Sequence, residues 1–177
     1  MIRTSLFLTA AVMLTGCMTG QDTTAARSGD STPAATAMLA AADGGSRGRA
    51  TFAEAGGALV VRVAAEGLPA GAHGIHIHTT GRCDAPDFAS AGPHWNPTSR
   101  QHGRDNPQGA HHGDLPNLNV GEDGRAALEF TVPEAQLAGL FDADGAALVV
   151  HASADDGRTD PSGNSGGRIA CGVIARR

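Results

Sequence analysis

The sequence contains no lysine and no tyrosine, and Trp95 is its only tryptophan. Aromatic residues make up 3% of the chain while glycine occurs 25 times, a balance that favours a turn-rich β architecture over a helical core. The cationic side chains are 13 arginines, which are outnumbered by 18 acidic residues, so the formal net charge is −5. An acidic chain repels polyanions, and we therefore expect no nucleic-acid partner.

A long hydrophobic run is also missing. The apolar stretch Leu6–Leu14 follows a single positive charge at Arg3 and is too short to span a bilayer, which is typical of a secretory signal. It leads into the letters Leu-Thr-Gly-Cys, which resemble the bacterial lipobox, whose cysteine becomes the lipid-modified first residue of the mature protein. We therefore predict a signal peptide at residues 1–16 and lipidation of Cys17.

The segment after Cys17 is rich in Ser, Thr, Ala and Gly and has no apolar periodicity, so residues 17–36 are predicted to be a flexible tether. Residues 37–177 are long enough for one folded domain with a core. These features predict a periplasmic protein that contacts a membrane through its lipid anchor only. Because Met18, and not aspartate, follows the lipidated cysteine, we expect sorting to the outer membrane.

Only three cysteines are present, and the predicted anchor uses one of them. Cys83 and Cys171 remain as a pair in an oxidising compartment, so they are expected to form a disulfide. A bridge between them would close a loop of 171 − 83 = 88 residues. In the chain-entropy model such a loop stabilises the folded state by roughly 4–5 kcal/mol.

Stretches of alternating apolar and polar residues recur along the domain and are mostly bounded by Gly, Pro or Asp-Gly, so we predict an all-β sandwich or barrel. The pattern fails over residues 79–120, and a long loop inside a compact domain is usually functional. The predicted strands are Ala37–Ala42, Arg49–Glu54, Ala58–Glu66, Gly74–His78, Arg125–Val132, Ala146–His151 and Ile169–Ala175.

The eight histidines all lie within this domain, and three of them fall in the stretch His-Gly-Ile-His-Ile-His. Strand alternation places His76 and His78 on one face, where they form a ligand pair or, alternatively, the polar face of a half-exposed strand. Imidazoles with a nearby carboxylate, Asp114, suit zinc or copper better than calcium or magnesium. The other histidines are His73, His94, His102, His111, His112 and His151.

Four motifs in order along residues 36–177 resemble the copper/zinc superoxide dismutase family. The resemblance implies an eight-stranded Greek-key β-barrel or sandwich with long metal-binding loops, copper and zinc as cofactors, and superoxide as substrate. It leaves open whether the chain is a monomer or a homodimer. The motifs are "GAHGIHIH", "AGPHWNP", "HHGDL" and "GNSGGRIACGVI".

Carried over position by position, the resemblance implies two ligand sets that share His94. Copper would be bound by His76, His78, His94 and His151, and zinc by His94, His102, His111 and Asp114.

Further residues outside the two ligand sets also match the family. Asp155 matches an outer carboxylate that orients ligands of both metals, and His73 would pack the strand without binding metal. The neighbouring Asp156 is expected to be an ordinary turn residue that faces solvent. Arg168 matches an anion-guiding arginine, so Arg168 and His94 are the expected catalytic residues.

Two other functions compete with the dismutase. A metal carrier on the same barrel would have no use for Arg168. A zinc hydrolase of the metallo-β-lactamase type would need Asp-His shortly after His78, but Thr79 and Thr80 stand there, so we set this reading aside.

Overall fold

The structure is a computed structural model that describes Met1 and residues 32–177. The described part is almost entirely β-structure with two short 3-10 helices, η1 (Ala89–Ala91) and η2 (Leu137–Leu140). None of its helices has the length and hydropathy needed to cross a membrane. The strands are β1 (Ala35–Ala40), β2 (Ser46–Ala55), β3 (Ala58–Ala65), β4 (Gly71–His73), β5 (Ile75–His78), β6 (Leu118–Val120), β7 (Ala126–Val132), β8 (Ala147–His151) and β9 (Arg168–Arg176).

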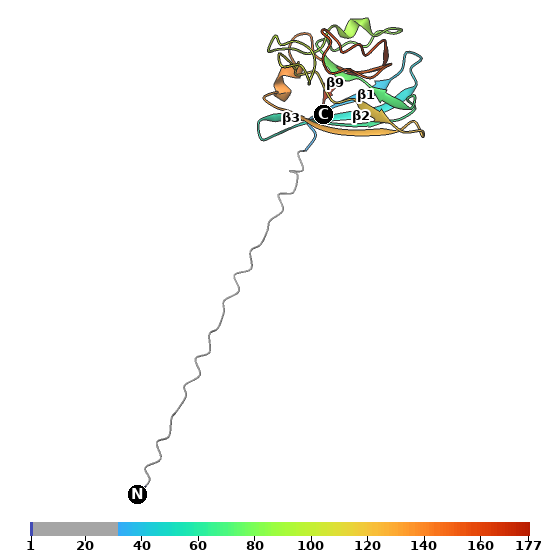
Figure 1. Ribbon diagram of the computed structural model, residues 1–177. Coiled ribbons are helices and arrows are strands. Elements are labelled where there is room, and N and C mark those ends of the chain that lie inside the picture. Colours follow the sequence, from blue (N-terminus) through green and yellow to red (C-terminus); the bar gives the residue numbers. More distant parts are fainter. Residues whose placement is uncertain (2–31) are drawn as a thin grey trace.

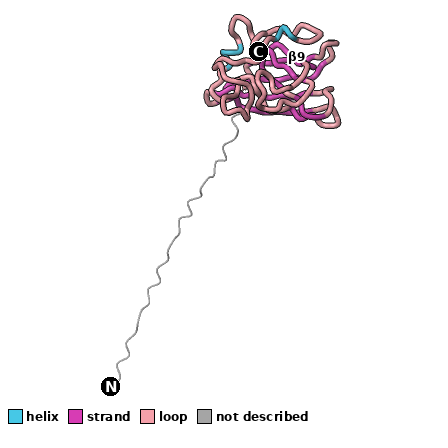
Figure 2. The backbone as a smooth tube through the Cα atoms, turned by 45° about the horizontal axis from the view of Figure 1, so that its top comes forward, coloured by secondary structure: helices cyan, strands magenta, loops and turns pink. Residues whose placement is uncertain are grey.

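Seven of these strands form one antiparallel sheet in the order β5-β8-β9-β1-β2-β3-β7, and β4 pairs with β6 in a small second sheet. Figure 1 shows the strands gathered on one side of the domain and the long connections on the other. Turning the molecule, as in Figure 2, shows how much of the chain runs as loops over the strands. The large sheet is curled (Figure 1), and the chain passes into it from the small sheet at Gly74, because β4 and β5 are consecutive but pair with different partners, β6 and β8.

Alternation along the strands builds the core on the concave side of the sheet. On β3, Leu59, Val61 and Val63 face inward and are almost fully buried, while Arg62 points outward to Glu129 on β7. Ile75 and Ile77 of β5 join the same cluster, so the two histidines of that strand must face the opposite side.

A second, smaller cluster covers the outer face of β8 and β9. Phe88 and Ala91 from the long loop pack there against Ala147 and Val149, beside the disulfide. The predicted disulfide between Cys83 and Cys171 is present, and it ties the long loop to β9. The long loop is thereby held on the outer face of the sheet, next to the histidines of β5.

The all-β prediction is confirmed, with some differences in detail. Alternation predicts seven strands, whereas the described residues contain nine, because β4 and β6 are three-residue strands too short to show alternation. The sequence places the start of the domain at residue 37. In the structure β1 begins two residues earlier, because Ala35 is already paired with Phe52 of β2. The predicted signal peptide, Cys17 and most of the tether lie outside the described residues.

Candidate metal centre

Two neighbouring strands carry three of the histidines. His76 and His78 alternate on β5, and His151 ends β8, which pairs antiparallel with β5. The register sets Val149 opposite His76 and Ala147 opposite His78, so the three imidazoles share the outer face of the sheet. All three are buried, which rules out the alternative of a half-exposed strand with incidental histidines.

The long loop delivers further ligand candidates because its backbone pairs with the free edge of β5. The Ile77 amide donates to the Gly113 carbonyl (3.0 Å), and the Ile77 carbonyl accepts from the Trp95 amide (2.8 Å). A Cβ at Gly113 would collide with the Ile77 carbonyl and approach the Trp95 backbone, so only glycine fits there. This pairing fixes His94 and Asp114 beside β5.

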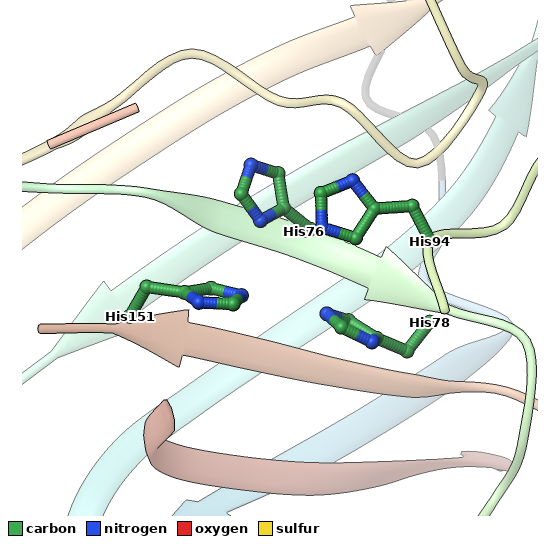
Figure 3. A group of neighbouring side chains, drawn as sticks. All are labelled: His76, His78, His94 and His151. Carbon is green, nitrogen blue, oxygen red and sulfur yellow. The ribbon is translucent and has the colours of Figure 1, made fainter. Parts of the chain in front are cut away.

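The first cluster, which we term the all-histidine group, consists of His76, His78, His94 and His151 (Figure 3). One nitrogen from each ring lies within 4.8 Å of the others, and all four side chains are buried. The buried nitrogens without a hydrogen-bond partner are His76 Nδ1, His78 Nε2, His94 Nε2 and His151 Nε2.

In three of these rings the second nitrogen is held by the protein. His78 Nδ1 lies 2.8 Å from the Gly92 carbonyl, and His151 Nδ1 lies 3.2 Å from the Gly166 carbonyl. His76 Nε2 lies 2.7 Å from Asp155 Oδ2. Each of these contacts favours a proton on the outer nitrogen and leaves a lone pair on the inner one, as a metal ligand requires.

The second cluster, the mixed group, consists of His94, His102, His111 and Asp114. Asp114 Oδ1 lies 2.9 Å from His94 Nδ1, 3.1 Å from His102 Nδ1 and 3.2 Å from His111 Nδ1. Asp114 Oδ2 accepts from the amides of Gly103 and His111, both at 3.0 Å. Three imidazoles and one carboxylate converging in a buried space match the ligand set of a tetrahedral zinc site.

His94 belongs to both groups through different nitrogens. Its Nδ1 faces Asp114, while its Nε2 is buried without a partner beside the other three rings. The rings of His94 and His76 stack with centroids 3.9 Å apart. The ring of His94 therefore lies between the two clusters and presents one nitrogen to each.

Asp155 connects the two groups from outside. Its Oδ2 lies 2.7 Å from His76 Nε2, and its Oδ1 lies 3.1 Å from His102 Nε2. The Gly157 amide donates to Oδ1 at 2.6 Å. At Gly163 the backbone φ is +62°, and a Cβ would overlap the carboxylate of Asp155, so glycine lets the loop close over it.

Burial sets the charge of the all-histidine group. Burial lowers the pKa of His78 to about 2, that of His151 to about 3 and that of His94 to about 4, and it lowers the pKa of His76 as well. These rings are therefore neutral at pH 7, the form in which imidazole binds a metal ion.

The mixed group behaves differently because it contains the carboxylate. Burial alone would lower the pKa of His102, but its contacts with Asp114 and Asp155 outweigh burial and raise the pKa to about 9. Burial works against the Asp114 carboxylate too, yet the surrounding imidazoles hold its pKa well below the usual range. In the metal-free protein at pH 7, His102 is thus an imidazolium beside Asp114.

The two groups differ in protonation at pH 7, and this difference predicts how many protons each metal ion displaces when it binds. Because His102 carries a proton below pH ~9, zinc binding at pH 7 should release about one proton from it, and zinc affinity should rise as the pH rises towards 9. Copper added to the zinc-loaded protein should release no proton from the neutral rings of His78 and His151, but about one from His94, because an imidazole that binds two ions through its two nitrogens has lost its N–H proton. Isothermal titration calorimetry in two buffers of different ionisation enthalpy measures both numbers. Copper binding without proton release would contradict the shared His94, and zinc binding at pH 7 without proton release would contradict the charged state of His102.

Arg168 stands at the mouth of the all-histidine group. Its Nη1 donates to the Phe88 carbonyl (2.6 Å) and its Nη2 to the Gly92 carbonyl (2.7 Å). It lines a cavity of about 400 Å³ together with His78, His94 and His151. None of the residues that line this cavity is acidic, so the guanidinium is the dominant charge that an entering anion meets.

The structure also places the remaining residues singled out in the sequence. His73 belongs to neither group, and its ring nitrogens lie 2.8 Å from the His151 carbonyl and 2.9 Å from the Pro69 carbonyl. His112 packs edge-on against Trp95. Asp156 is exposed but does more than a solvated turn residue, because its carboxylate accepts from the amides of Arg158 and Thr159, and from the side chains of Thr159 and Asn164.

Two side chains near the site had no recognisable sequence signal. Asp160 Oδ1 accepts from the His102 amide at 2.6 Å, and Asn117 is hydrogen-bonded to the backbone of Asp155. Neither belongs to a motif with a known ligand spacing. Only the closeness of Asn117 to Asp114 in the sequence could have drawn attention to it.

Comparisons with known proteins agree on one family. A family model described as copper/zinc superoxide dismutase (SODC) matches residues 46–174. The superoxide dismutase [Cu-Zn] of Caulobacter vibrioides is 42% identical over 147 residues, which cover 79% of this chain and 84% of the relative. The chain is also similar to a crystal structure of a SOD-like protein from Bacillus subtilis, with 39% sequence identity and a TM-score of 0.74. The superposition covers 78% of this chain and 96% of that protein chain.

Another relative is the superoxide dismutase-like protein YojM of Bacillus subtilis, which is 45% identical over 122 residues. The match covers 66% of this chain but only 62% of that protein.

Proposed function

Because the chain belongs to the copper/zinc superoxide dismutase family, we propose that it converts superoxide to dioxygen and hydrogen peroxide at the cavity between Arg168 and the all-histidine group. The observation that carries this proposal is the imidazole of His94, which takes part in two ligand clusters through its two nitrogens. In the balanced reaction, two superoxide anions and two protons give one dioxygen and one hydrogen peroxide.

The residues present fit both metals of the family. The all-histidine group offers four nitrogens that are buried and have no hydrogen-bond partner, a donor set suited to copper. The mixed group adds the carboxylate of Asp114, which suits zinc. When bound, copper supplies one-electron redox chemistry by alternating between Cu(II) and Cu(I), while zinc keeps a single oxidation state.

The protein's own groups admit and orient the substrate. Two carbonyls hold the guanidinium of Arg168 at the cavity, where it attracts an anion and can donate two parallel hydrogen bonds to it. His94 lines the same cavity, and its Nε2 is the atom at which we place a proton destined for the peroxide product. Ser162 adds a hydroxyl to the cavity wall.

The competing proposal is a metal carrier. A carrier needs ligands but no anion-binding cation beside them, so Arg168 at the cavity favours the enzyme. The two readings separate in one experiment, in which the purified protein loaded with copper and zinc is mixed with a pulse of superoxide. A dismutase consumes superoxide catalytically, whereas a carrier consumes at most about one equivalent for each copper ion.

We further propose that the protein is a periplasmic lipoprotein held at the outer membrane through Cys17. The support is the short apolar run and the lipobox-like letters that end in this cysteine. A homodimer remains an alternative to the monomer, and sedimentation equilibrium of the metal-loaded domain decides between them.

Replacing the proposed anchor cysteine tests the location. In a Cys17→Ser chain we expect the protein to move from the membrane fraction to the soluble fraction and to lose incorporation of labelled fatty acid, because one thiol carries the whole anchor. Wild-type protein that already fractionates with soluble periplasmic proteins would contradict the proposal.

A further inference from the structure

The amide side chain of Asn117 forms two hydrogen bonds with the backbone of a single residue, Asp155. Its Oδ1 accepts from the Asp155 amide at 2.8 Å, and its Nδ2 donates to the Asp155 carbonyl at 2.9 Å. A side chain that satisfies both backbone groups of one residue acts like a strand partner and fixes the orientation of that residue. The two residues are 38 positions apart, so the contact joins two separate loops.

The orientation of Asp155 matters because its two oxygens hold one ring in each cluster. Oδ2 lies 2.7 Å from His76 Nε2, and Oδ1 lies 3.1 Å from His102 Nε2. The Asp155 side chain is only 7% exposed, so bulk water offers these rings little replacement. A rotation of the Asp155 backbone would weaken both contacts together.

Asn117 is anchored by the mixed group itself. It follows Asp114 by three residues, and Leu115 between them is buried in the core. A cavity of about 130 Å³ lies beside Asn117 and Asp155 and is otherwise lined mainly by polar residues. If the amide of Asn117 is removed, water can therefore enter and hydrogen-bond the Asp155 backbone. This water limits the loss of folding stability, but it does not fix the orientation of Asp155.

We propose that Asn117 is a positioning residue for both clusters: it holds Asp155 so that one carboxylate orients His76 and His102. This inference rests on the ligand assignment of the proposed function. It goes beyond that assignment because Asn117 touches neither cluster and acts only through the backbone of Asp155.

The test uses Asn117→Ala and, as a matched control, Asn119→Ala. Asn119 lies two residues further along, on β6, and its side chain is exposed and makes no hydrogen bond within the described residues. Each protein is loaded with zinc and with reduced, diamagnetic copper, and NMR follows the exchange of the imidazole N–H protons with solvent. The Nδ1–H of His78, which faces the Gly92 carbonyl, serves as an internal reference.

In Asn117→Ala we expect the Nε2–H protons of His76 and His102 to exchange about 10-fold faster, with the His78 proton unchanged. Copper affinity, measured by competition with a chelator, should fall about 10-fold. Asn119→Ala should match the wild type. As a second variant, Asn117→Asp keeps the size and one acceptor oxygen but loses the donor to the Asp155 carbonyl, and it should also speed exchange at His76 and His102.

Unchanged exchange at His76 and His102 in Asn117→Ala would overturn the inference, and so would equal acceleration at all three rings, which indicates general loosening. Failure of the ligand assignment looks different, because the imidazole signals of the wild-type protein would then not shift when copper and zinc are added. Failure of the dismutase function is different again, because the wild-type protein would then bind both ions but not consume superoxide catalytically.

Discussion

Removing copper while leaving zinc in place is expected to reduce superoxide consumption to the level of buffer without protein. The all-histidine group contains only imidazole nitrogens, none of which can accept or donate an electron at these potentials. The mixed group is expected to hold zinc, which has no accessible second oxidation state. All electron transfer must therefore depend on the copper ion, and adding copper back should restore full activity, as measured by pulse radiolysis.

The sharpest control for this result is protein with zinc in both clusters. Zinc satisfies the same buried nitrogens and preserves the fold, so this form separates loss of redox chemistry from loss of structure. We expect thermal stability close to that of the copper form and no activity. Catalytic turnover by the all-zinc protein, or by the metal-free protein, would contradict the copper mechanism.

Replacement of Arg168 by alanine is expected to lower kcat/KM for superoxide by about 10- to 100-fold, with copper and zinc contents unchanged. The chain has a net charge of −5 and should repel the substrate, so capture depends on the local field at the cavity. Arg168 supplies that field, and no acidic side chain lines the cavity to oppose it. Superoxide dismutases are themselves a standard example of such electrostatic steering.

Two further variants define the role of Arg168. Arg158 lies in the loop that leads into β9, of which Arg168 is the first residue, but does not line the cavity, so Arg158→Ala should keep kcat/KM within about twofold of the wild type. Arg168→Lys keeps the charge but cannot donate to the Phe88 and Gly92 carbonyls with the same fork, so its activity should be intermediate. Stopped-flow rates at increasing salt should fall steeply for wild type and only weakly for Arg168→Ala, and equal salt dependence would contradict the steering role.

Much of the site could be predicted because its residues occur in short ordered motifs. Alternation on one strand placed His76 and His78 together, and the structure buries both on the outer face as expected. The family resemblance predicted that His94 is shared, and the structure does place it in both clusters; its role as a metal bridge remains a prediction.

The connections between loops could not be predicted, because they depend on backbone groups. The carbonyls of Phe88 and Gly92 that hold Arg168 leave no trace in the sequence, and β6 is too short to show a period. Asn117 resembles any loop asparagine until the fold brings Asp155 beside it. Tertiary contacts, and not local pattern, decide these positions.

The central claim is that the imidazole of His94 is bound on its two sides by two different metal ions. A crystal structure of the purified protein loaded with copper and zinc, with anomalous data collected at both absorption edges, tests this directly. We expect copper at His94 Nε2 with His76, His78 and His151, and zinc at His94 Nδ1 with His102, His111 and Asp114. A ring of His94 that contacts neither ion, or only one of them, in the oxidised protein would contradict the account.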